Sequence, residues 1–205
     1  INSILWVDEI IVADSHSTDG TTEIAEELGA KVIQIPFNGY GDLRNQAITH
    51  CNGDWIISLD SDERCTHKVR DEILSLVENA TFDIYRVPRK NFFMGKWIKH
   101  SGWYPNFRQP QLFKNGKMSY TLDSVHEGFI NHSDKEIGVI KNFIWQFPFK
   151  NTEEVINKAN RYSTLGIEKL QKSGVTGGVL KAFFHGLWSF IKHYIFKLGF
   201  LDGGA

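Results

Sequence analysis

The chain has 205 residues, which is enough for one domain with a sizeable core. Its 23 basic and 24 acidic residues nearly cancel, which excludes the strong positive field that nonspecific nucleic-acid binding needs. Two cysteines, Cys51 and Cys65, fit neither a metal spacing nor a disulfide framework, and therefore predict a reducing compartment.

Strands and helices alternate over the first eighty residues. The runs 8–14, 31–35 and 54–60 are apolar or β-branched and predict strands. Helices are predicted at 18–30, 41–51 and 67–80, the first with Thr18 or Asp19 as its cap and Gly29 as its stop. The third is amphipathic, with Val69, Ile73, Leu76 and Val77 on one side. This alternation predicts an α/β fold with a mostly parallel sheet and helices on both faces.

The pattern changes after Phe82. Segments 82–93, 108–120 and 137–147 predict strands, and Asn115-Gly116 is a hairpin signal within the second. Segment 151–174 predicts a helix with Thr152 as its cap and Gly174 as its stop. We expect one domain over 1–150, followed by C-terminal helices over 151–205.

Acidic side chains follow two of the predicted strands. Asp14 ends the first, and Asp60 and Asp62 follow the third as an Asp-x-Asp (DXD) pattern. If the two strands are neighbours, the three carboxylates converge at the edge where open α/β sheets bind ligands. Carboxylates suit Mg²⁺ or Mn²⁺ bridged to substrate phosphates.

Two other interpretations of the Asp-x-Asp pattern stay open. A solvated acidic turn with Arg64 as its local partner explains the pattern equally well. A haloacid-dehalogenase-type phosphatase also has Asp-x-Asp at a strand end. That family has Thr or Val two residues after the second Asp, where this chain has Arg64. We therefore rank the phosphatase interpretation lower.

Several segments resemble family 2 glycosyltransferases, which have the GT-A (Rossmann-like) fold. The stretches "VDEIIVADSHSTDGTTEIAEELGAKV" and "GDLRNQAITHCNGDWIISLDSDER" are similar to the family's nucleotide-binding half. The later stretches "GWYPNFRQPQLFKNGKMSY", "SVHEGF", "NKANRYS" and "GFLDG" resemble, in the same order, bacterial lipopolysaccharide-core β-glucosyltransferases and their capsule and O-antigen relatives.

The resemblance implies roles in binding a nucleotide-sugar donor. Asp14 would bind the uracil or ribose, Arg44 the base or diphosphate, and Asp60 the ribose or sugar. Asp62 would hold the metal, Mg²⁺ or Mn²⁺. The family inverts the anomeric centre, which requires a base for the acceptor hydroxyl. Glu127 is the candidate base.

Other residues could take part in the proton transfer. His126 would orient Glu127, contact a phosphate or share the proton, and Asp123 is the fallback base. A surface carboxylate and a satisfied, partly buried imidazole are the alternative interpretations of Glu127 and His126.

The chain departs from the family pattern at three points. The family begins with a strand that precedes Ile1 here, so the resemblance implies that a central strand is missing and that activity of this polypeptide alone is in doubt. His16 stands where relatives often have Gly, which could narrow the pocket. Gln111 stands where many have Arg, which puts a phosphate contact there in doubt.

Aromatic residues alternate with cations between the two halves. Trp97, Trp103 and Tyr104 are candidate acceptor-binding residues, because aromatic faces suit sugar rings. Lys96, Lys99 and His100 would suit phosphorylated sugars. A loop folded over the sheet by its own aromatics is an equally good interpretation.

The segment 179–201 is apolar and aromatic, but carries polar residues at helical spacing. These are Lys181, His185, Ser189, Lys192, His193 and Lys197. The pattern predicts a basic amphipathic helix that lies in the plane of the headgroups rather than a membrane span. Packing on the domain, or an oligomer contact, is the alternative.

We therefore expect an inverting glycosyltransferase that moves a sugar, at first guess from UDP-glucose, to a lipid-linked bacterial saccharide such as the lipopolysaccharide inner core. It would act in the cytoplasm, peripherally on the inner face of the inner membrane, with no nucleic-acid partner. The second hypothesis is a non-catalytic membrane-surface interaction protein, decayed or truncated, on the same fold.

Overall fold

The computed structural model describes residues 1–107, 109–122, 128–172 and 178–203. The chain forms two compact units. Unit 1 comprises Ile1–Pro88 and Phe107–Ile144, and unit 2 comprises Arg89–Asn106 and Trp145–Ala205. The second unit thus takes in a segment from before the expected boundary at residue 150.

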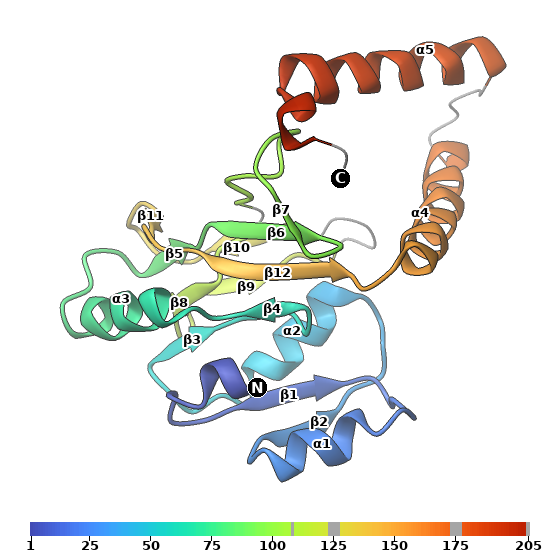
Figure 1. The fold of residues 1–205 in the computed structure, drawn as a ribbon. Coiled ribbons are helices and arrows are strands. Elements are labelled where there is room, and N and C mark those ends of the chain that lie inside the picture. The colour runs from blue at the N-terminus through green and yellow to red at the C-terminus, as the bar shows by residue number, and fades with distance from the viewer. Residues whose placement is uncertain (108, 123–127, 173–177, 204–205) are drawn as a thin grey trace. The chain divides into compact units, whose positions relative to one another are not determined.

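Unit 1 begins with a β-α-β segment. After the 3-10 turn Asn2–Ile4 (η1), strand β1 (Ile11–Asp14) pairs in parallel with β2 (Lys31–Gln34), with Asp14 opposite Gln34. Helix α1 (Thr21–Glu27) connects them (Figure 1). Gly29 adopts φ +82°, as expected of a glycine stop. The cap of α1 is Gly20 rather than Thr18 or Asp19, although Asp19 Oδ1 accepts the Thr21 N–H at 3.2 Å.

The next elements follow the predicted order. They are α2 (Tyr40–Ile48), β3 (Trp55–Ile57), β4 (Glu63–Arg64) and α3 (His67–Glu78). Thr66 Oγ1 caps α3 by accepting the Val69 N–H at 3.3 Å. The predicted apolar side of α3 is confirmed, because Val69 and Ile73 are buried and Leu76 and Val77 pack beside them.

Unit 1 contains a four-stranded sheet in the order β11-β5-β8-β3. The other strands are β5 (Ile84–Arg86), β8 (Leu112–Lys114) and β11 (Gly138–Val139). β5 and β11 are parallel, whereas β8 runs antiparallel to both β3 and β5. The α/β class is confirmed, and the sheet is more mixed than predicted because β8 follows the β-α repeats without a crossover helix.

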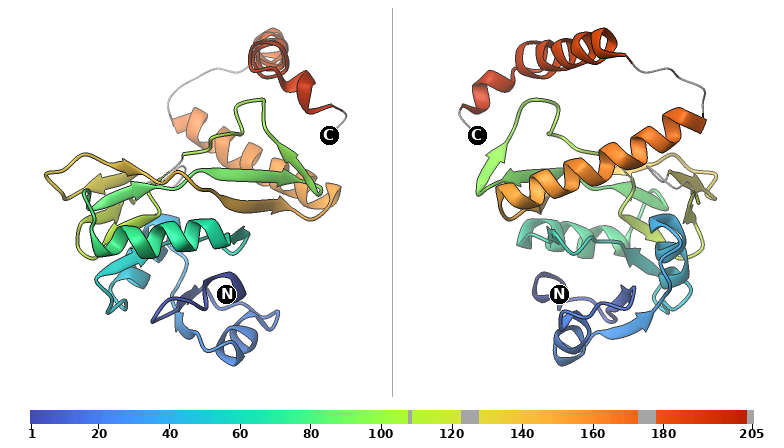
Figure 2. Two further views of the ribbon diagram at one scale, coloured as in Figure 1. Left: turned by 60° about the vertical axis from the view of Figure 1, so that its left-hand side comes forward. Right: turned by 90° about the vertical axis from the view of Figure 1, so that its right-hand side faces the viewer.

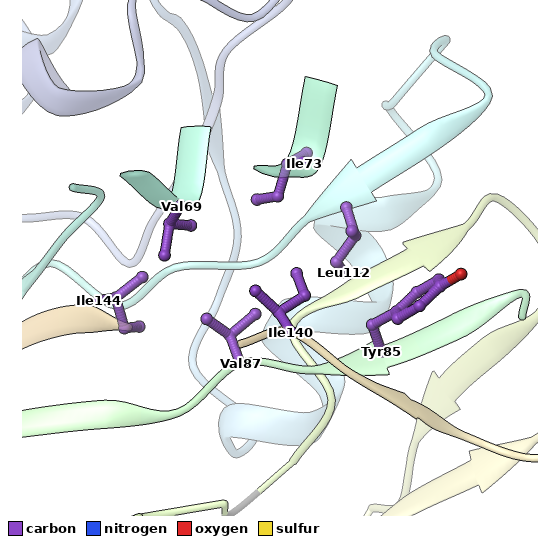
Figure 3. Packing of buried hydrophobic residues seen from close by; sticks show 7 residues of the cluster. All are labelled: Val69, Ile73, Tyr85, Val87, Leu112, Ile140 and Ile144. Atoms are coloured by element: carbon purple, nitrogen blue, oxygen red, sulfur yellow. The ribbon is translucent and has the colours of Figure 1, made fainter. Parts of the chain in front are cut away.

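Alternate residues of the sheet enter two separate cores. One core joins Tyr85 and Leu112 to Val69 and Ile73 of α3, as Figure 3 shows. The neighbouring residues Ile84 and Phe113 point into the other core, with Ile48 from the end of α2 packed against it. Helices therefore cover both faces, as the sequence predicts.

The hairpin expected at Asn115-Gly116 does not form. Gly116 has φ +78° and the Lys117 N–H bonds to the Lys114 carbonyl at 3.0 Å, so a tight turn is present. In the described residues, however, β9 (Met118–Tyr120) pairs with β10 (Phe129–Asn131) rather than with β8. Met118 and Tyr120 of β9 are buried in the second core, together with Phe113 of β8.

Unit 2 contains two strands that overlap longer predicted ones, β6 (Arg89–Phe93) and β12 (Ile144–Phe149), and one that was not predicted, β7 (Lys96–Ile98). Their order is β12-β6-β7. β6 and β7 form a hairpin with Phe92 opposite Trp97. Helix α4 (Thr152–Lys172) follows, and its cap is Asn151 rather than Thr152, because Asn151 Oδ1 accepts the Glu154 N–H at 2.9 Å. Gly174 lies outside the described residues.

The C-terminal elements form a helical rod followed by a tight turn (Figure 2). They are α5 (Val179–Phe190), the π-helical turn η2 (Ile191–Phe196) and the 3-10 turn η3 (Gly199–Asp202). Among the described helices, none combines the length and apolar character that a membrane span requires. Segment 179–196 is helical, as predicted, and its position in the plane of the headgroups stays a prediction.

Candidate active site

Arg44 is the positive partner of the acidic cluster after β3. Its NH2 group lies 2.6 Å from Asp60 Oδ1, and the two side chains are 20% and 45% exposed. The guanidinium lies 5.2 Å from the centre of the Tyr120 ring and 5.9 Å from that of Tyr40. A planar cation between two rings is held in a fixed orientation.

The residue after Arg44 fixes the helix that carries it. The Asn45 side-chain amide donates to the Tyr120 carbonyl at 2.9 Å and accepts the Tyr120 N–H at 2.8 Å. These two hydrogen bonds attach α2 to β9. The neighbouring residues Arg44 and Asn45 thus have different roles. Asn45 holds the helix, and Arg44 forms the ion pair with Asp60.

Buried hydrogen bonds hold the loop Asp60-Ser61-Asp62, the Asp-Ser-Asp loop, in place. One oxygen of Glu63, which is 4% exposed, accepts the Asp60 N–H at 2.9 Å and the Gln111 side-chain amide at 2.8 Å. The Glu63 N–H bonds back to the Asp60 carbonyl at 2.9 Å. Gln111 is therefore a buried support of the loop, consistent with the doubt about a phosphate contact there.

Arg64 donates hydrogen bonds to the backbone of its own loop. Its NH1 group donates to the Ser61 carbonyl at 2.9 Å and to the Glu63 carbonyl at 2.7 Å, both on the backbone. The interpretation of a solvated acidic turn with Arg64 as partner is therefore weakened, because the carboxylate of Asp60 pairs with Arg44 from another helix.

Asp14 lies at the carboxyl end of β1 and is 5% exposed. Its Oδ2 accepts the Ser17 N–H at 2.9 Å, and hydrogen bonds from Ser17 are the main reason why the pKa of Asp14 is lowered. The carboxylate is therefore negative at neutral pH. His16, where relatives often have Gly, adopts φ +58°, a conformation that favours glycine.

Two polar atoms near these carboxylates are buried and have no hydrogen-bond partner in the described residues. They are Ser15 Oγ, next to Asp14, and Gln111 Oε1, beside Glu63. Buried polar atoms usually have partners, so such atoms are common where a ligand or water belongs.

The expected convergence of Asp14 with Asp60 and Asp62 stays a prediction. In the described part of the chain, β1 pairs only with β2, and β3 belongs to the sheet of β8. No group of three or more His, Cys, Asp or Glu side chains that could hold a metal is found there. A Mg²⁺ ion shared with a diphosphate needs only one or two carboxylates, so the donor set of Asp60 and Asp62 still fits.

The three predicted acceptor-binding aromatics all lie in unit 2. Trp97 and Tyr104 meet edge to face at 5.6 Å, and Lys90 Nζ lies 4.0 Å from the centre of the Trp97 ring. Trp103 packs edge-on against Phe93. The residues thus support one another as a folded aromatic loop, and acceptor binding stays a prediction.

The candidate base Glu127, its neighbour His126 and the fallback Asp123 lie outside the described residues. Their roles stay predictions. Sequence reasoning missed Asn45, Tyr120 and the support of the loop by Glu63. The signal for Glu63 was its position directly behind Asp62, at the start of a strand that buries alternate residues.

The sequence profile of glycosyl transferase family 2 matches residues 2–140. An uncharacterized glycosyltransferase of Rickettsia felis is 29% identical over 99% of this chain and 75% of its own length. The lipopolysaccharide core biosynthesis glycosyltransferase LpsC of Rhizobium meliloti is 30% identical over 85% of this chain and 66% of its own length.

Solved structures agree in fold. Residues 1–349 of S. aureus TarS match with a TM-score of 0.52 and 16% identity, over 68% of this chain and 51% of that one. The same protein in complex with UDP-GlcNAc matches with a TM-score of 0.52 and 17% identity, over 70% of this chain and 50% of that one. This chain thus spans about half the length of these structures.

Fold, site and profile together define a glycosyltransferase of the GT-A class. The chain belongs to glycosyl transferase family 2.

Proposed function

We propose that the protein transfers a sugar from a nucleotide-sugar donor to a lipid-linked bacterial saccharide, with inversion at the anomeric carbon. The observation that carries this proposal is the Arg44–Asp60 pair, which sets a fixed cation beside a partly exposed carboxylate directly after β3. Family membership and the UDP-GlcNAc complex of TarS support a nucleotide-sugar donor. UDP-glucose is the first donor to test.

The donor would be held by charges of both signs. Asp14, whose carboxylate stays ionised, accepts hydrogen bonds from the uracil or ribose. The Arg44 guanidinium, oriented by its contacts with two aromatic rings, donates hydrogen bonds to the base or diphosphate. Asp60 accepts hydrogen bonds from hydroxyls of the ribose or sugar. Glu63 holds the backbone of Asp60 in place.

Asp62, with Asp60 beside it, would hold Mg²⁺ or Mn²⁺, which supplies positive charge to the departing nucleoside diphosphate. Asp62 is only partly buried, so its carboxylate is accessible to a ligand.

Transfer requires one displacement. The acceptor oxygen forms a bond to the anomeric carbon as the bond from that carbon to the diphosphate oxygen breaks, and the acceptor proton passes to a carboxylate. Glu127 takes that proton, with His126 as the residue that orients it, and Asp123 is the fallback.

The acceptor would lie at a membrane surface. All residues of α5 are exposed, including Phe183, Phe184 and Trp188, and residues 179–201 contain Lys and His but no acid. Such a helix binds in the headgroup plane of an anionic membrane. The aromatic loop with Trp97, Trp103 and Tyr104 would bind sugar rings of a lipid-linked acceptor, and the name of LpsC supports lipopolysaccharide core as its class. The enzyme would work peripherally on the cytoplasmic face of the inner membrane.

A second candidate function is a non-catalytic protein of the membrane surface on the same fold. It is favoured by the division of the described strands into separate sheets, β1-β2 and the sheet of β3 among them, because the proposed donor site uses residues that end or follow strands of both.

Mass spectrometry of glycolipids from cells that lack the gene tests the proposal. We expect the lipopolysaccharide core to lose one sugar, and wild-type protein to restore it. Glu127→Gln and Asp62→Ala should fail to restore it, whereas Asp134→Ala, which removes an exposed carboxylate outside the site, should succeed. Unchanged glycolipid masses after gene loss would contradict the proposed function.

A further inference from the structure

Asp202 connects the C-terminal turn to the loop that follows β7. Its Oδ2 accepts the His100 N–H at 2.9 Å, and its Oδ1 accepts the Lys99 N–H at 3.1 Å. The same Oδ1 lies 2.9 Å from His100 Nδ1. The carbonyl of Asp202 also accepts a hydrogen bond from Lys96 Nζ. With only 9% of its side chain exposed, Asp202 is a buried carboxylate with three donors on one loop.

A second set of contacts lies beside the first. The Ser101 N–H bonds to the Lys197 carbonyl at 2.9 Å, and the Ser101 carbonyl lies 2.9 Å from His193 Nδ1. Since a carbonyl only accepts, His193 donates from Nδ1. Gly199 is buried here, and a Cβ at this position would lie 2.4 Å from Ser101 Oγ and 2.8 Å from the His193 carbonyl oxygen. The two segments therefore touch backbone to backbone.

The other end of the loop is fixed to β6. The Trp103 carbonyl accepts the Asn91 side-chain amide at 2.7 Å, and Asn91 is buried. Trp103 also packs edge-on against Phe93, and Trp97 against Tyr104. Of the three aromatics proposed for acceptor binding, Trp97 thus lies on β7, and Trp103 and Tyr104 lie on the following loop, which has two attachments, one to β6 and one to the C-terminal turn.

The C-terminal attachment leads directly to α5. Residues 191–202 continue α5 through the π-helical turn η2, which contributes His193, to η3, which contributes Gly199 and Asp202. A displacement of α5 is transmitted through this short segment to the aromatic loop, because each turn bonds to the loop.

We propose that Asp202 is a positioning residue that locks the aromatic loop 96–104 to the α5 segment, so that attachment of α5 to a membrane also orders the loop that receives a lipid-linked acceptor. This inference rests on the proposed function for the identity of the acceptor. The lock itself rests only on the contacts of Asp202, Ser101 and Gly199. Asp202 acts through the loop and does not touch the reacting atoms.

Substitution of Asp202 by Asn separates this role from that of a simple charge. An amide offers one oxygen and one NH₂ group, which is a donor and cannot accept. If the NH₂ replaces Oδ2, the His100 N–H loses its acceptor, and if it replaces Oδ1, the Lys99 N–H and the His100 ring lose theirs. Gly199→Ala reaches the same contact by a different route, since its Cβ forces the turn away from Ser101.

Hydrogen–deuterium exchange of the full chain tests the lock, with and without vesicles of phosphatidylethanolamine and phosphatidylglycerol. In the wild type, we expect vesicles to slow exchange both in 179–196 and in 96–104. In Asp202→Asn and in Gly199→Ala, exchange at 99–103 should be faster by about tenfold, and vesicles should still protect α5 but no longer the loop. Glu153→Gln, an exposed acid of α4, is the matched control and should behave like the wild type.

The outcomes separate the two claims. Wild-type exchange of the loop in both variants would overturn the lock. Vesicle protection of α5 without any protection of the wild-type loop would overturn the coupling to the membrane. Neither readout involves a nucleotide or a sugar, so a failure of the proposed glycosyl transfer would leave these exchange results unaffected.

Discussion

Arg44 reaches from α2 to Asp60 and forms an ion pair at 2.6 Å between its NH2 group and Oδ1. The two residues are sixteen positions apart. Asn45 holds α2, the helix that carries Arg44, by its hydrogen bond to Tyr120. A carboxylate that is already paired with a cation can exchange it for a metal ion, so that its negative charge stays compensated. This is a useful arrangement for binding a diphosphate next to a metal.

Replacement of Arg44 should weaken nucleotide binding. We expect Arg44→Ala to raise the Kd for UDP by about tenfold or more, which is the effect of losing one charge-assisted hydrogen bond. Arg44→Lys should recover little, because an ammonium lacks the planar face that lies against Tyr40 and Tyr120. Isothermal titration measures both variants.

The control for Arg44 is Arg70→Ala, which removes another arginine that pairs with a carboxylate, at 2.7 Å from Asp71 on α3. Its Kd for UDP should equal that of the wild type. A wild-type Kd in Arg44→Ala would remove Arg44 from the donor site.

Loss of the Glu63 carboxylate should release the Asp-Ser-Asp loop. In Glu63→Ala the Asp60 N–H and the Gln111 amide both lose their acceptor, which should cost about 2 kcal/mol and lower the melting temperature by about 4–8 °C. Glu63→Gln should be milder, because the Gln111 amide can turn its unpartnered oxygen toward the new NH₂ group. Calorimetry that finds the two variants equally destabilised would argue against this network.

Acid should weaken the contacts of Asp83. The Ser133 hydroxyl, at 2.7 Å, is the main cause that lowers the pKa of Asp83 from 3.8 to about 2, and Lys114 and Lys135 add to it. Because the folded-state pKa is the lower one, the ionised carboxylate stabilises the fold fully above pH 3.8, and this contribution is lost as the pH falls through about 2.

Urea unfolding between pH 5 and pH 2 measures this effect, with the interval set by the ordinary and lowered values of the Asp83 pKa. Asp83→Asn should be less stable than the wild type at neutral pH and should converge with it in acid. A constant difference in unfolding free energy over the whole interval would show that Asp83 does not titrate as described.

The exposed apolar side chains of α5 should determine attachment to membranes. Phe183 and Phe184 are each 63% exposed, so we expect the double variant Phe183→Glu/Phe184→Glu to lose most of its flotation with phosphatidylglycerol vesicles. Ile24→Glu changes a side chain on α1 that is 57% exposed and should float like the wild type. Equal flotation of the double variant and the wild type would assign α5 to a protein contact instead.

Local signals in the sequence predicted the fold best. Gly29 and the apolar side of α3 are features of a few neighbouring residues, and both are confirmed. The Asn115-Gly116 signal predicts the turn correctly but not the pairing of the strands beside it, because β9 pairs with β10, a strand further along the chain. Strand pairing depends on such distant contacts, which a local pattern does not contain.

The site was predictable only as a set of candidates. The family resemblance predicts roles for Asp60 and Arg44, which stay predictions, and the structure adds that the two side chains pair with each other. The roles of Gln111 and Asp202 could not be read from the sequence, since each depends on a partner from a distant segment, Glu63 and His100 respectively.

Thermal unfolding with UDP and Mn²⁺ tests the central claim, a donor site at Asp60 and Asp62, most directly. With both ligands at about 100 times their Kd, the melting temperature of the wild type should rise by about 5 °C or more, since a ligand at that excess stabilises by about 2.7 kcal/mol. Asp62→Ala should lose the part of the rise that depends on Mn²⁺, and Asp134→Ala should keep it. A wild-type protein whose melting temperature does not change with UDP and Mn²⁺, or an Asp62→Ala variant with an undiminished rise, would contradict the account.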